Sequence, residues 1–361
     1  MNDTLPAEAS SALSEGDGLL RRGEVRAAIE VLTRANRHLP TAELERALVR
    51  VRHQGCGSLP APAPNTWEPV VAKPSDGAVV EIDVAELDAA AVRHGLERSG
   101  CLLVRGLVPS DAAERLVEGI DATYEAFDAA MAEAPYDPRW FHPFPMPDVI
   151  SPGPAAGAVR LSPGAPPAGP VARRLHRKLT REGAGIWTVD SPRMLFEVLE
   201  VVDEVRLGDV ITSYLGERPF LSANKCTLRR VPAKEPTGGW HQDGAFLGRD
   251  VVSLNCWIAL NPCGTDAPGI DVIPKRFDDI LEPGVRDAFF KWSLSDADVL
   301  DAGDGASPVR PQFEAGDALL FDHRLVHRTG GSQAMTRERY ALESWWFAPS
   351  AFPPSQRPLV Y

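Results

Sequence analysis

The chain has 361 residues, enough for a large buried core, and is expected to form one main domain with a smaller appendage. Its formal net charge of −12 at pH 7 gives no support for a nucleic-acid partner, because phosphate backbones repel an acidic surface. No apolar run approaches the roughly 18 residues that cross a bilayer, and the N-terminus lacks the layout of a secretory signal, so a cytoplasmic location without membrane contact is expected.

Residues 1–57 are predicted to form a helical appendage. The segment resembles one tetratricopeptide-type helical hairpin through the spacing of Gly16, Leu19, Gly23, Ala28, Ala35 and Pro40. Ala27, Val31 and Leu32 are expected to face inward, and Thr41 is predicted to cap a further helix. Since one repeat cannot form a groove alone, the hairpin is either a cap packed on the main domain or a docking module for a protein partner.

Residues 58–78 are rich in proline and alanine and are interpreted as a semi-extended linker. Residues 79–361 are predicted to form the main domain. Its first elements are expected to be a strand over Val79–Ile82, a helix over Val84–His94, a strand over Cys101–Val104 and a helix that starts at Ser110.

Residues 135–170 have many prolines and glycines and no regular periodicity. The stretch contains the aromatic residues Trp140, Phe141 and Phe144, which favour a substrate lid over simple disorder. A basic cluster follows, interpreted as a solvated helix face or as a contact for an anionic substrate. The cluster consists of Arg173, Arg174, Arg177, Lys178 and Arg181.

Two histidines and one aspartate indicate a metal site. In an extended strand His241 and Asp243 project to the same face, and His327 on a distant strand supplies a third ligand. This set leaves three octahedral positions open, as in the facial triad of non-haem iron(II) oxygenases. His323 is a rival for the distal position, and His241 alone is also compatible with a hydrogen-bonded strand histidine without a metal.

An aromatic-rich strand is predicted over residues 337–347, soon after the distal histidine. Arg337 and Arg339 have the same parity, so either can point inward. A guanidinium here can hold the far carboxylate of 2-oxoglutarate, the co-substrate that supplies two electrons to such oxygenases, through two parallel hydrogen bonds.

These motifs, in this order, resemble the phytanoyl-CoA dioxygenase family over roughly residues 80 to 350. The resemblance rests on Gly239–Gly244, the strand Cys256–Leu260, Ile273-Pro274, Gly316–Asp322 and His327-Arg328-Thr329 followed by Arg339. It implies a mainly β fold with flanking helices, a double-stranded β-helix or jelly-roll, and iron(II), 2-oxoglutarate and O₂ as metal, co-substrate and oxidant.

The resemblance also assigns roles to residues. His241, Asp243 and His327 would be the catalytic metal ligands, and Arg339, assisted by Thr329, would bind the far carboxylate of 2-oxoglutarate. Trp257 and Thr227 match positions beside the co-substrate. The interval from His327 to Arg339 is one residue longer than the commonest family spacing, and Arg339 is preferred over Arg337 because Arg-Tyr-Ala-Leu resembles the family's strand start. The intact Asp243 counts against the family's halogenating relatives.

The expected reaction is hydroxylation of an unactivated C–H bond of a small molecule or a carrier-tethered metabolite, coupled to oxidation of 2-oxoglutarate to succinate and carbon dioxide. Desaturation, ring formation and epimerisation fit the same site. Two other classes remain open: a metal-dependent hydrolase or isomerase on the same barrel, and a partner-binding protein with a silent barrel.

The five cysteines are odd in number and form no Cys-x-x-Cys pair. This pattern favours a reducing compartment and argues against a thiolate metal site. Cys226 and Cys256 lie in apolar, strand-like stretches and are expected to be buried as small hydrophobic residues.

Overall fold

The computed structural model describes residues 5–62, 67–145, 177, 180–283 and 293–361. Its main helices are α1 (Ala7–Arg21), α2 (Val25–His38), α3 (Ala42–Gln54), α4 (Ala89–Ser99), α5 (Ser110–Met131), α7 (Pro192–Glu204), α8 (Leu207–Leu215), α9 (Gly244–Leu247) and α10 (Asp296–Gly303). The strands are β1 (Val80–Asp83), β2 (Cys101–Arg105), β3 (Gly185–Trp187), β4 (Phe220–Ser222), β5 (Thr227–Val231), β6 (Ser253–Ala259), β7 (Gly269–Val272), β8 (Ala318–Phe321), β9 (His327–Gly330), β10 (Arg339–Phe347) and β11 (Pro358–Val360).

The fold is mainly sheet with flanking helices, as the sequence predicts. The larger sheet has the order β1-β2-β8-β6-β10-β4-β11, with β5 also paired to β10 and β3 paired to β5. Its pairs are antiparallel except for β1 with β2, which run parallel. The second sheet consists of β7 and β9, and single bridges extend it from His327 to His241 and from Val272 to Val309.

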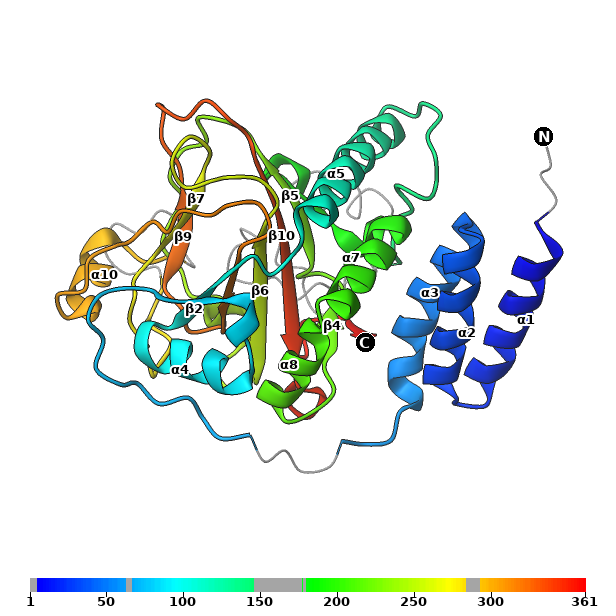
Figure 1. Ribbon diagram of the computed structural model, residues 1–361, viewed down its shortest axis with the longest axis horizontal. Coiled ribbons are helices and arrows are strands. Elements are labelled where there is room, and N and C mark those ends of the chain that lie inside the picture. Colours follow the sequence, from blue (N-terminus) through cyan, green and yellow to red (C-terminus); the bar gives the residue numbers. More distant parts are fainter. Residues whose placement is uncertain (1–4, 63–66, 146–176, 178–179, 284–292) are drawn as a thin grey trace, which may run out of the picture.

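The middle of the larger sheet is covered on both faces, since β6 and β8 are buried at every position. In β8, Ala318 and Leu320 belong to a core shared with the helices, whereas Leu319 and Phe321 belong to a core shared with β7. Figure 1 shows α5, α7 and α8 on one side of β6 and β10, with β7 and β9 on the other. In the described part of the chain no helix is long and apolar enough to cross a membrane.

The first elements of the main domain largely follow the prediction. β1, β2 and the start of α5 at Ser110 are as expected, but the single helix predicted over Val84–His94 is wrong. Two N-terminal caps divide it: Asp83 caps a 3-10 turn, and Asp88 accepts a hydrogen bond from the amide of Ala91 and starts α4 instead.

The N-terminal helices bury a face that differs from the predicted one. In α2 the buried apolar residues are Val25, Ala28, Ile29 and Leu32, whereas Ala27 and Val31 are only partly covered. Helical spacing places these buried residues on one continuous apolar stripe of α2. Leu32 in this stripe packs against α1, where a Cβ added at Gly16 would lie 3.0 Å from the Leu32 side chain. The predicted Thr41 cap is confirmed, because its hydroxyl accepts a hydrogen bond from the amide of Leu44.

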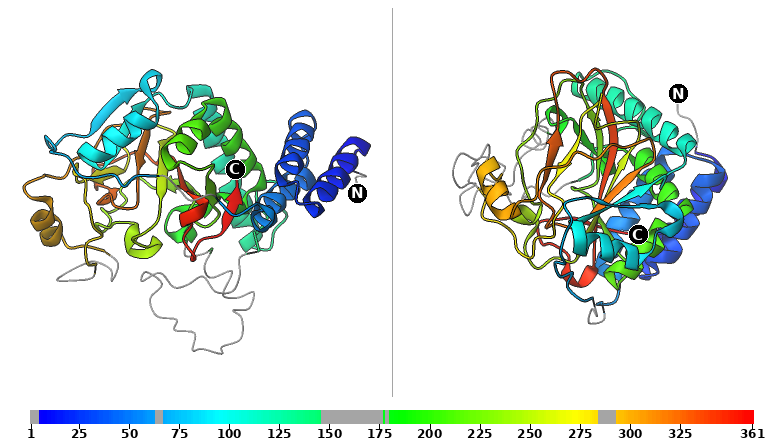
Figure 2. Two further views of the ribbon diagram at one scale, coloured as in Figure 1. Left: turned by 90° about the horizontal axis from the view of Figure 1, so that it is seen from below. Right: turned by 60° about the vertical axis from the view of Figure 1, so that its left-hand side comes forward.

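The helix α3 attaches this appendage to the rest of the protein. Its buried carboxylate Glu45 lies 3.1 Å from Arg193 of α7, and the guanidinium of Arg52 donates a 2.7 Å hydrogen bond to the carbonyl of Val360. Arg37 of α2 forms two hydrogen bonds with Glu200 of α7. Figure 2 shows the three helices stacked at one end of the molecule, with α3 innermost.

The described part of the predicted linker lies along the main domain. Val70 is buried, the amide of Lys73 donates to the carbonyl of Glu97, and the hydroxyl of Ser75 donates to the carbonyl of Pro274. The backbone of residues 67–79 therefore makes fixed contacts although it forms no helix or strand.

Two aromatic residues of the predicted lid are core residues. Phe141 and Phe144 are buried, and the carboxylate of Asp190 accepts a 2.7 Å hydrogen bond from the amide of Phe144. Asp190 also pairs at 2.7 Å with Arg177, which is buried and therefore belongs neither to a solvated helix face nor to a contact for an anionic substrate. Residues 146–170 of the predicted lid and Arg173, Arg174 and Lys178 lie outside the described residues, whereas Arg181 pairs with Asp128 at 3.0 Å.

The reactivity of the cysteine thiols tests whether these residues are buried. Four cysteines are buried, including Cys226 and Cys256 as predicted, and Cys56 is half-buried. Burial raises the pKa of Cys101, Cys226 and Cys263 to about 12, so little reactive thiolate forms. We expect the native protein to react slowly with Ellman's reagent, Cys56 first, and the denatured protein to expose all five thiols. A rapid reaction of two or more native thiols would contradict this packing.

Candidate metal centre

The two histidines become neighbours through backbone pairing. His327 is the first residue of β9, and it exchanges two 3.0 Å hydrogen bonds with His241 across an antiparallel bridge. The strand continues from His327 to Gly330, and a turn lies before the histidine. The ligand therefore lies at the start of a strand, where the pairing fixes its Cα position.

Asp243 reaches the same place by a different route from the predicted one. The strand-like pairing ends at His241, and Asp243 has φ −62° and ψ −24° at the N-terminus of α9. The amide of Leu247 donates a 2.9 Å hydrogen bond to the carbonyl of Asp243. Gly244 leaves room for the side chain of Ile280, which would have to move if a Cβ were added there, because its Cδ1 atom would lie 2.2 Å away.

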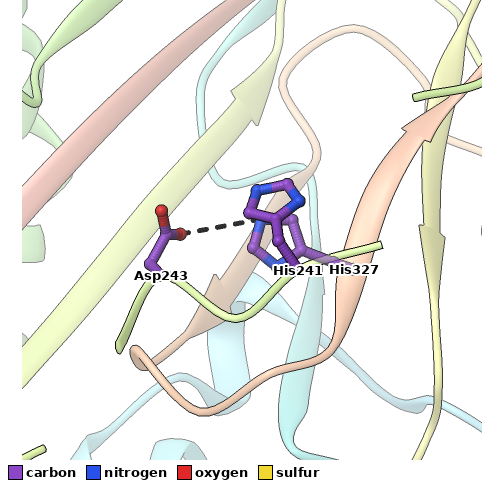
Figure 3. A group of neighbouring side chains, drawn as sticks. All are labelled: His241, Asp243 and His327. Atoms are coloured by element: carbon purple, nitrogen blue, oxygen red, sulfur yellow. Dashed lines mark ion pairs between the residues drawn. The ribbon is translucent and has the colours of Figure 1, made fainter. Parts of the chain in front are cut away.

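The three side chains converge. The potential ligand atoms of His241, Asp243 and His327 all lie within 4.8 Å of one another. The Nε2 atom of His327 lies 3.6 Å from Oδ2 of Asp243, and the centroids of the two imidazole rings are 4.3 Å apart. Figure 3 shows the carboxylate facing the two rings. Imidazole nitrogens with one carboxylate oxygen form a donor set suited to iron, and the side chains present fit such an ion.

Each histidine is held in the tautomer that a metal requires. Nδ1 of His241 lies 3.0 Å from the carbonyl oxygen of Gly239, and Nδ1 of His327 lies 3.1 Å from that of Leu325. Because a carbonyl oxygen only accepts hydrogen bonds, both Nδ1 atoms carry the proton. Nε2 is then the unprotonated ligand atom in each ring, and the backbone fixes the ring orientation.

The electrostatics keep the site ready for a cation. Burial and the neighbouring His327 lower the pKa of His241 to about 4, so this imidazole is neutral at pH 7. Burial raises the pKa of Asp243, but Lys225 and the two imidazoles outweigh it, and the net pKa lies below the ordinary value. Neutral imidazole and ionised carboxylate are the forms that bind metals.

His323, the rival distal residue, is engaged elsewhere. Its Nε2 donates to the carbonyl of Arg249 at 3.2 Å, and its Nδ1 accepts from the hydroxyl of Ser253 at 3.1 Å. Both ring nitrogens therefore have protein partners, and the ring is buried outside the His–Asp–His cluster.

The two candidate anchor arginines differ in environment. Arg337 is exposed, whereas Arg339 starts β10 and is 4% exposed. The guanidinium of Arg339 lies 5.6 Å from the ring of Trp257 and donates to the carbonyl of Gly269 at 2.7 Å. Its buried Nε has no protein acceptor among the described residues. Burial lowers the pKa of Arg339 to about 10, so the side chain stays cationic at pH 7. Among the described residues it forms no ion pair with a carboxylate.

The other predicted contacts lie on the inner side of the two sheets. Thr329 follows His327 by two residues in β9 and therefore points to the same face. Trp257 is buried in β6 beside Arg339. Thr227 is buried at the start of β5, opposite Glu343 of β10, on the same face as Arg339. These three side chains thus share the interior with the His–Asp–His cluster.

Sequence reasoning missed a group of charges next to Asp243. Lys225, in the turn between β4 and β5, places its ammonium 3.4 Å from Oδ1 of Asp243. Arg229 and Glu343 form a 2.7 Å ion pair on the inner face of the sheet. The position of Lys225 two residues before Thr227 is a signal in the sequence, but only the turn geometry reveals that its side chain reaches α9.

Comparison with solved structures finds similar folds at low identity. EctD from S. alaskensis, solved with 2-oxoglutarate and 5-hydroxyectoine, is 17% identical, with a TM-score of 0.48 over 73% of this chain and 76% of that one. The carbocyclase SnoK is 14% identical, with a TM-score of 0.45 over 74% and 87% of the two chains. The non-heme monooxygenase ThoJ in its nickel complex is 16% identical, with a TM-score of 0.44 over 74% and 79%. These scores decide neither reaction nor substrate.

No curated protein matches the sequence. The model of the phytanoyl-CoA dioxygenase family, however, matches residues 96–338, which include the His–Asp–His cluster. The match covers more than half of the chain, and the protein therefore belongs to the phytanoyl-CoA dioxygenase family.

Proposed function

We propose that the protein is an iron(II)- and 2-oxoglutarate-dependent oxygenase that hydroxylates an unactivated C–H bond of a small molecule or a carrier-tethered metabolite. The observation that carries the proposal is the cluster of His241, Asp243 and His327, with both histidines held in the metal-binding tautomer. Family membership supports iron and 2-oxoglutarate as the metal and co-substrate.

Each residue of the site has a proposed role in binding the metal or 2-oxoglutarate. His241 and His327 would bind iron through Nε2, and Asp243 through Oδ2, the oxygen that faces His327. Arg339 would hold the far carboxylate of 2-oxoglutarate, with Thr329 assisting. When bound, iron would activate O₂ for C–H hydroxylation, with 2-oxoglutarate as the two-electron reductant. Trp257 and Thr227 would confine the co-substrate on the inner face, and the apolar walls exclude water.

The arrangement of the sheets supports a double-stranded β-helix as the finer description of the fold. Two largely antiparallel sheets face each other across a shared core. His327 lies in the smaller sheet, His241 is bridged to it, and Asp243 lies at the start of α9. The carboxylate-binding arginine comes from the larger sheet. Such a barrel encloses one small-ligand site.

The buried guanidinium of Arg339 favours the oxygenase over the alternative functions. A hydrolase or isomerase on the same barrel would use the metal cluster but has no need of Arg339, whose Nε lacks a protein acceptor. A silent, partner-binding barrel would be expected to have lost a metal ligand, yet all three are present. Both observations favour the oxygenase.

The proposal is tested with the full chain, iron(II), 2-oxoglutarate and O₂. We expect slow succinate release and oxygen consumption without a primary substrate, both stimulated when a metabolite fraction contains the substrate. Omission of iron or of 2-oxoglutarate is the control and should stop both signals. Metal-dependent turnover that continues without 2-oxoglutarate would instead indicate the hydrolase or isomerase, and no turnover with intact iron binding would indicate a silent barrel.

Removal of residues 1–57 tests the domain division, which we propose as appendage 1–57, linker 58–78 and catalytic domain 79–361. Since every proposed site residue lies beyond the linker, the shortened protein should still bind metal and 2-oxoglutarate. It should lose thermal stability and solubility, because Phe196 and Phe220 lose their apolar cover and Arg193 loses Glu45. Calorimetric titration and thermal melts measure both effects.

The matched control is Arg37→Ala in the full chain. This change removes one partly exposed ion pair with Glu200 and should alter stability by no more than about 1 kcal/mol. A shortened protein that is soluble and active on a free substrate but inactive on a protein-tethered one would favour the docking module. Loss of metal binding from a shortened protein with an intact circular dichroism spectrum would overturn the domain division.

A further inference from the structure

Lys225 bridges the turn before β5 and the helix α9. Its ammonium lies 3.4 Å from Oδ1 of Asp243 and 4.0 Å from the centroid of the Phe246 ring. Its side chain is 25% exposed, so one side of it is open to a further ligand. Within the described part of the chain, Asp243 is the carboxylate with which Lys225 pairs.

The backbone around Lys225 is fixed, so the side chain occupies a defined place. The amide of Ala223 donates to the carbonyl of Arg357 at 2.8 Å, and the carbonyl of Cys226 accepts from the amide of Thr188 at 2.9 Å. In the register of β5 and β10, Thr227 lies opposite Glu343, whereas Arg339 lies opposite Val231 at the other end. Lys225 thus lies at the metal end of the interior, away from the proposed 2-oxoglutarate anchor.

The neighbouring charges are already balanced. Arg229 and Glu343 satisfy each other through a 2.7 Å ion pair, so neither is a spare partner for Lys225. The four side chains Lys225, Arg229, Asp243 and Glu343 carry no net charge together. A divalent metal changes this balance, because the charge of Asp243 is then shared with the ion.

The loaded site would leave one positive charge only partly balanced. Two metal charges would be offset by Asp243 and by one carboxylate of 2-oxoglutarate, and the far carboxylate would be offset by Arg339. Lys225 then keeps Oδ1 of Asp243 and the ring of Phe246 beside it, but the charge of that carboxylate is shared with the ion. A partly buried ammonium without an anion is unfavourable, and an anion placed next to it is stabilised.

We propose that Lys225 is a specificity-determining residue that pairs with a carboxylate, or a similar anionic oxygen group, of the substrate. The inference rests on the proposed oxygenase function and names the substrate class for the same site. Lys225 would orient the substrate beside the metal while Arg339 holds the co-substrate.

The test uses the full chain with iron(II) and saturating 2-oxoglutarate without oxygen, followed by its visible charge-transfer band. The probes are two near-isosteric pairs, benzoate with benzamide and hexanoate with hexanamide. In the wild type, each carboxylate should perturb the band at a concentration about tenfold or more below its amide. Lys225→Met should remove this difference, and Lys225→Arg should restore most of it.

Two measurements separate the possible failures. Titration at two concentrations of 2-oxoglutarate identifies probes that merely displace the co-substrate, since their effect weakens as its concentration rises. Lys225→Met should still bind the metal, because His241, Asp243 and His327 remain, and it should still bind 2-oxoglutarate, because Arg339 remains. An unchanged preference in Lys225→Met, no response to any carboxylate, or loss of metal binding in the variant would each overturn the role of Lys225. Absence of the band in the wild type would overturn the oxygenase proposal itself.

Discussion

Replacement of His241 or His327 by alanine is expected to abolish turnover and to weaken metal binding sharply while the protein stays folded. Under the proposed assignment each imidazole would supply a direct ligand bond, so the loss should exceed the roughly 10–100-fold in metal affinity that removal of an outer hydrogen-bond partner costs. The fold should persist because the bridge between the two residues is made by backbone atoms, which alanine retains. Calorimetric titration with iron(II) or manganese(II), together with succinate release, measures the effect.

His323→Ala is the matched control. This histidine is also buried in the same region, but its two nitrogens bind Ser253 and the backbone of Arg249. The variant should lose some stability and keep most of its metal affinity. If His323→Ala loses metal and His327→Ala keeps it, with both variants folded by circular dichroism, the distal ligand has been misassigned.

Arg339→Ala is expected to weaken 2-oxoglutarate binding by about 2–4 kcal/mol, the range for losing one partner of a buried, hydrogen-bonded charge pair. The structure supplies the reason: the guanidinium is buried beside Trp257, and its Nε has no acceptor among the described residues. Binding is measured by titration of 2-oxoglutarate into the metal-loaded protein without oxygen.

Arg337→Ala serves as the comparison, because Arg337 lies two residues earlier and is exposed. Its effect on 2-oxoglutarate binding should be small, since a solvated surface charge contributes little. Arg339→Lys should recover only part of the affinity, because an ammonium cannot form the planar, two-bond contact. A larger loss in Arg337→Ala than in Arg339→Ala would show that the co-substrate lies elsewhere.

The sequence predicted which residues would gather at the site better than it predicted how. His241 and His327 form the expected adjacent pair, but Asp243 joins them through a helical turn rather than through strand alternation. The period-2 argument assumed that the strand continues past His241. The helical turn at Asp243 brings the carboxylate to the same two histidines. Whether the chain forms a strand or a helical turn at this point depends on the tertiary packing around Gly244.

Predictions from local sequence patterns were correct for the starts of α3 and α5, which depend on residues close together in the sequence. Thr41 caps α3, because capping depends on a side chain a few residues away, and α5 starts at Ser110 directly after Pro109. Patterns failed where partners are distant in the sequence. The burial of Phe144 and the pairing of Lys225 with Asp243 depend on segments that only the folded chain brings together.

The central position of β10 has a consequence for how the protein is made. This strand pairs with β4, β5 and β6, which all precede it by many residues, and β8 completes the other flank of β6. While the chain emerges from the ribosome, β5 and β6 must therefore wait for a strand synthesised long after them. Such long-range closure is slow, and the waiting apolar strands are prone to aggregation. Nascent chains arrested before Arg339 should thus be sensitive to proteases and bound by chaperones, and chains arrested with β10 and β11 outside the exit tunnel should become resistant.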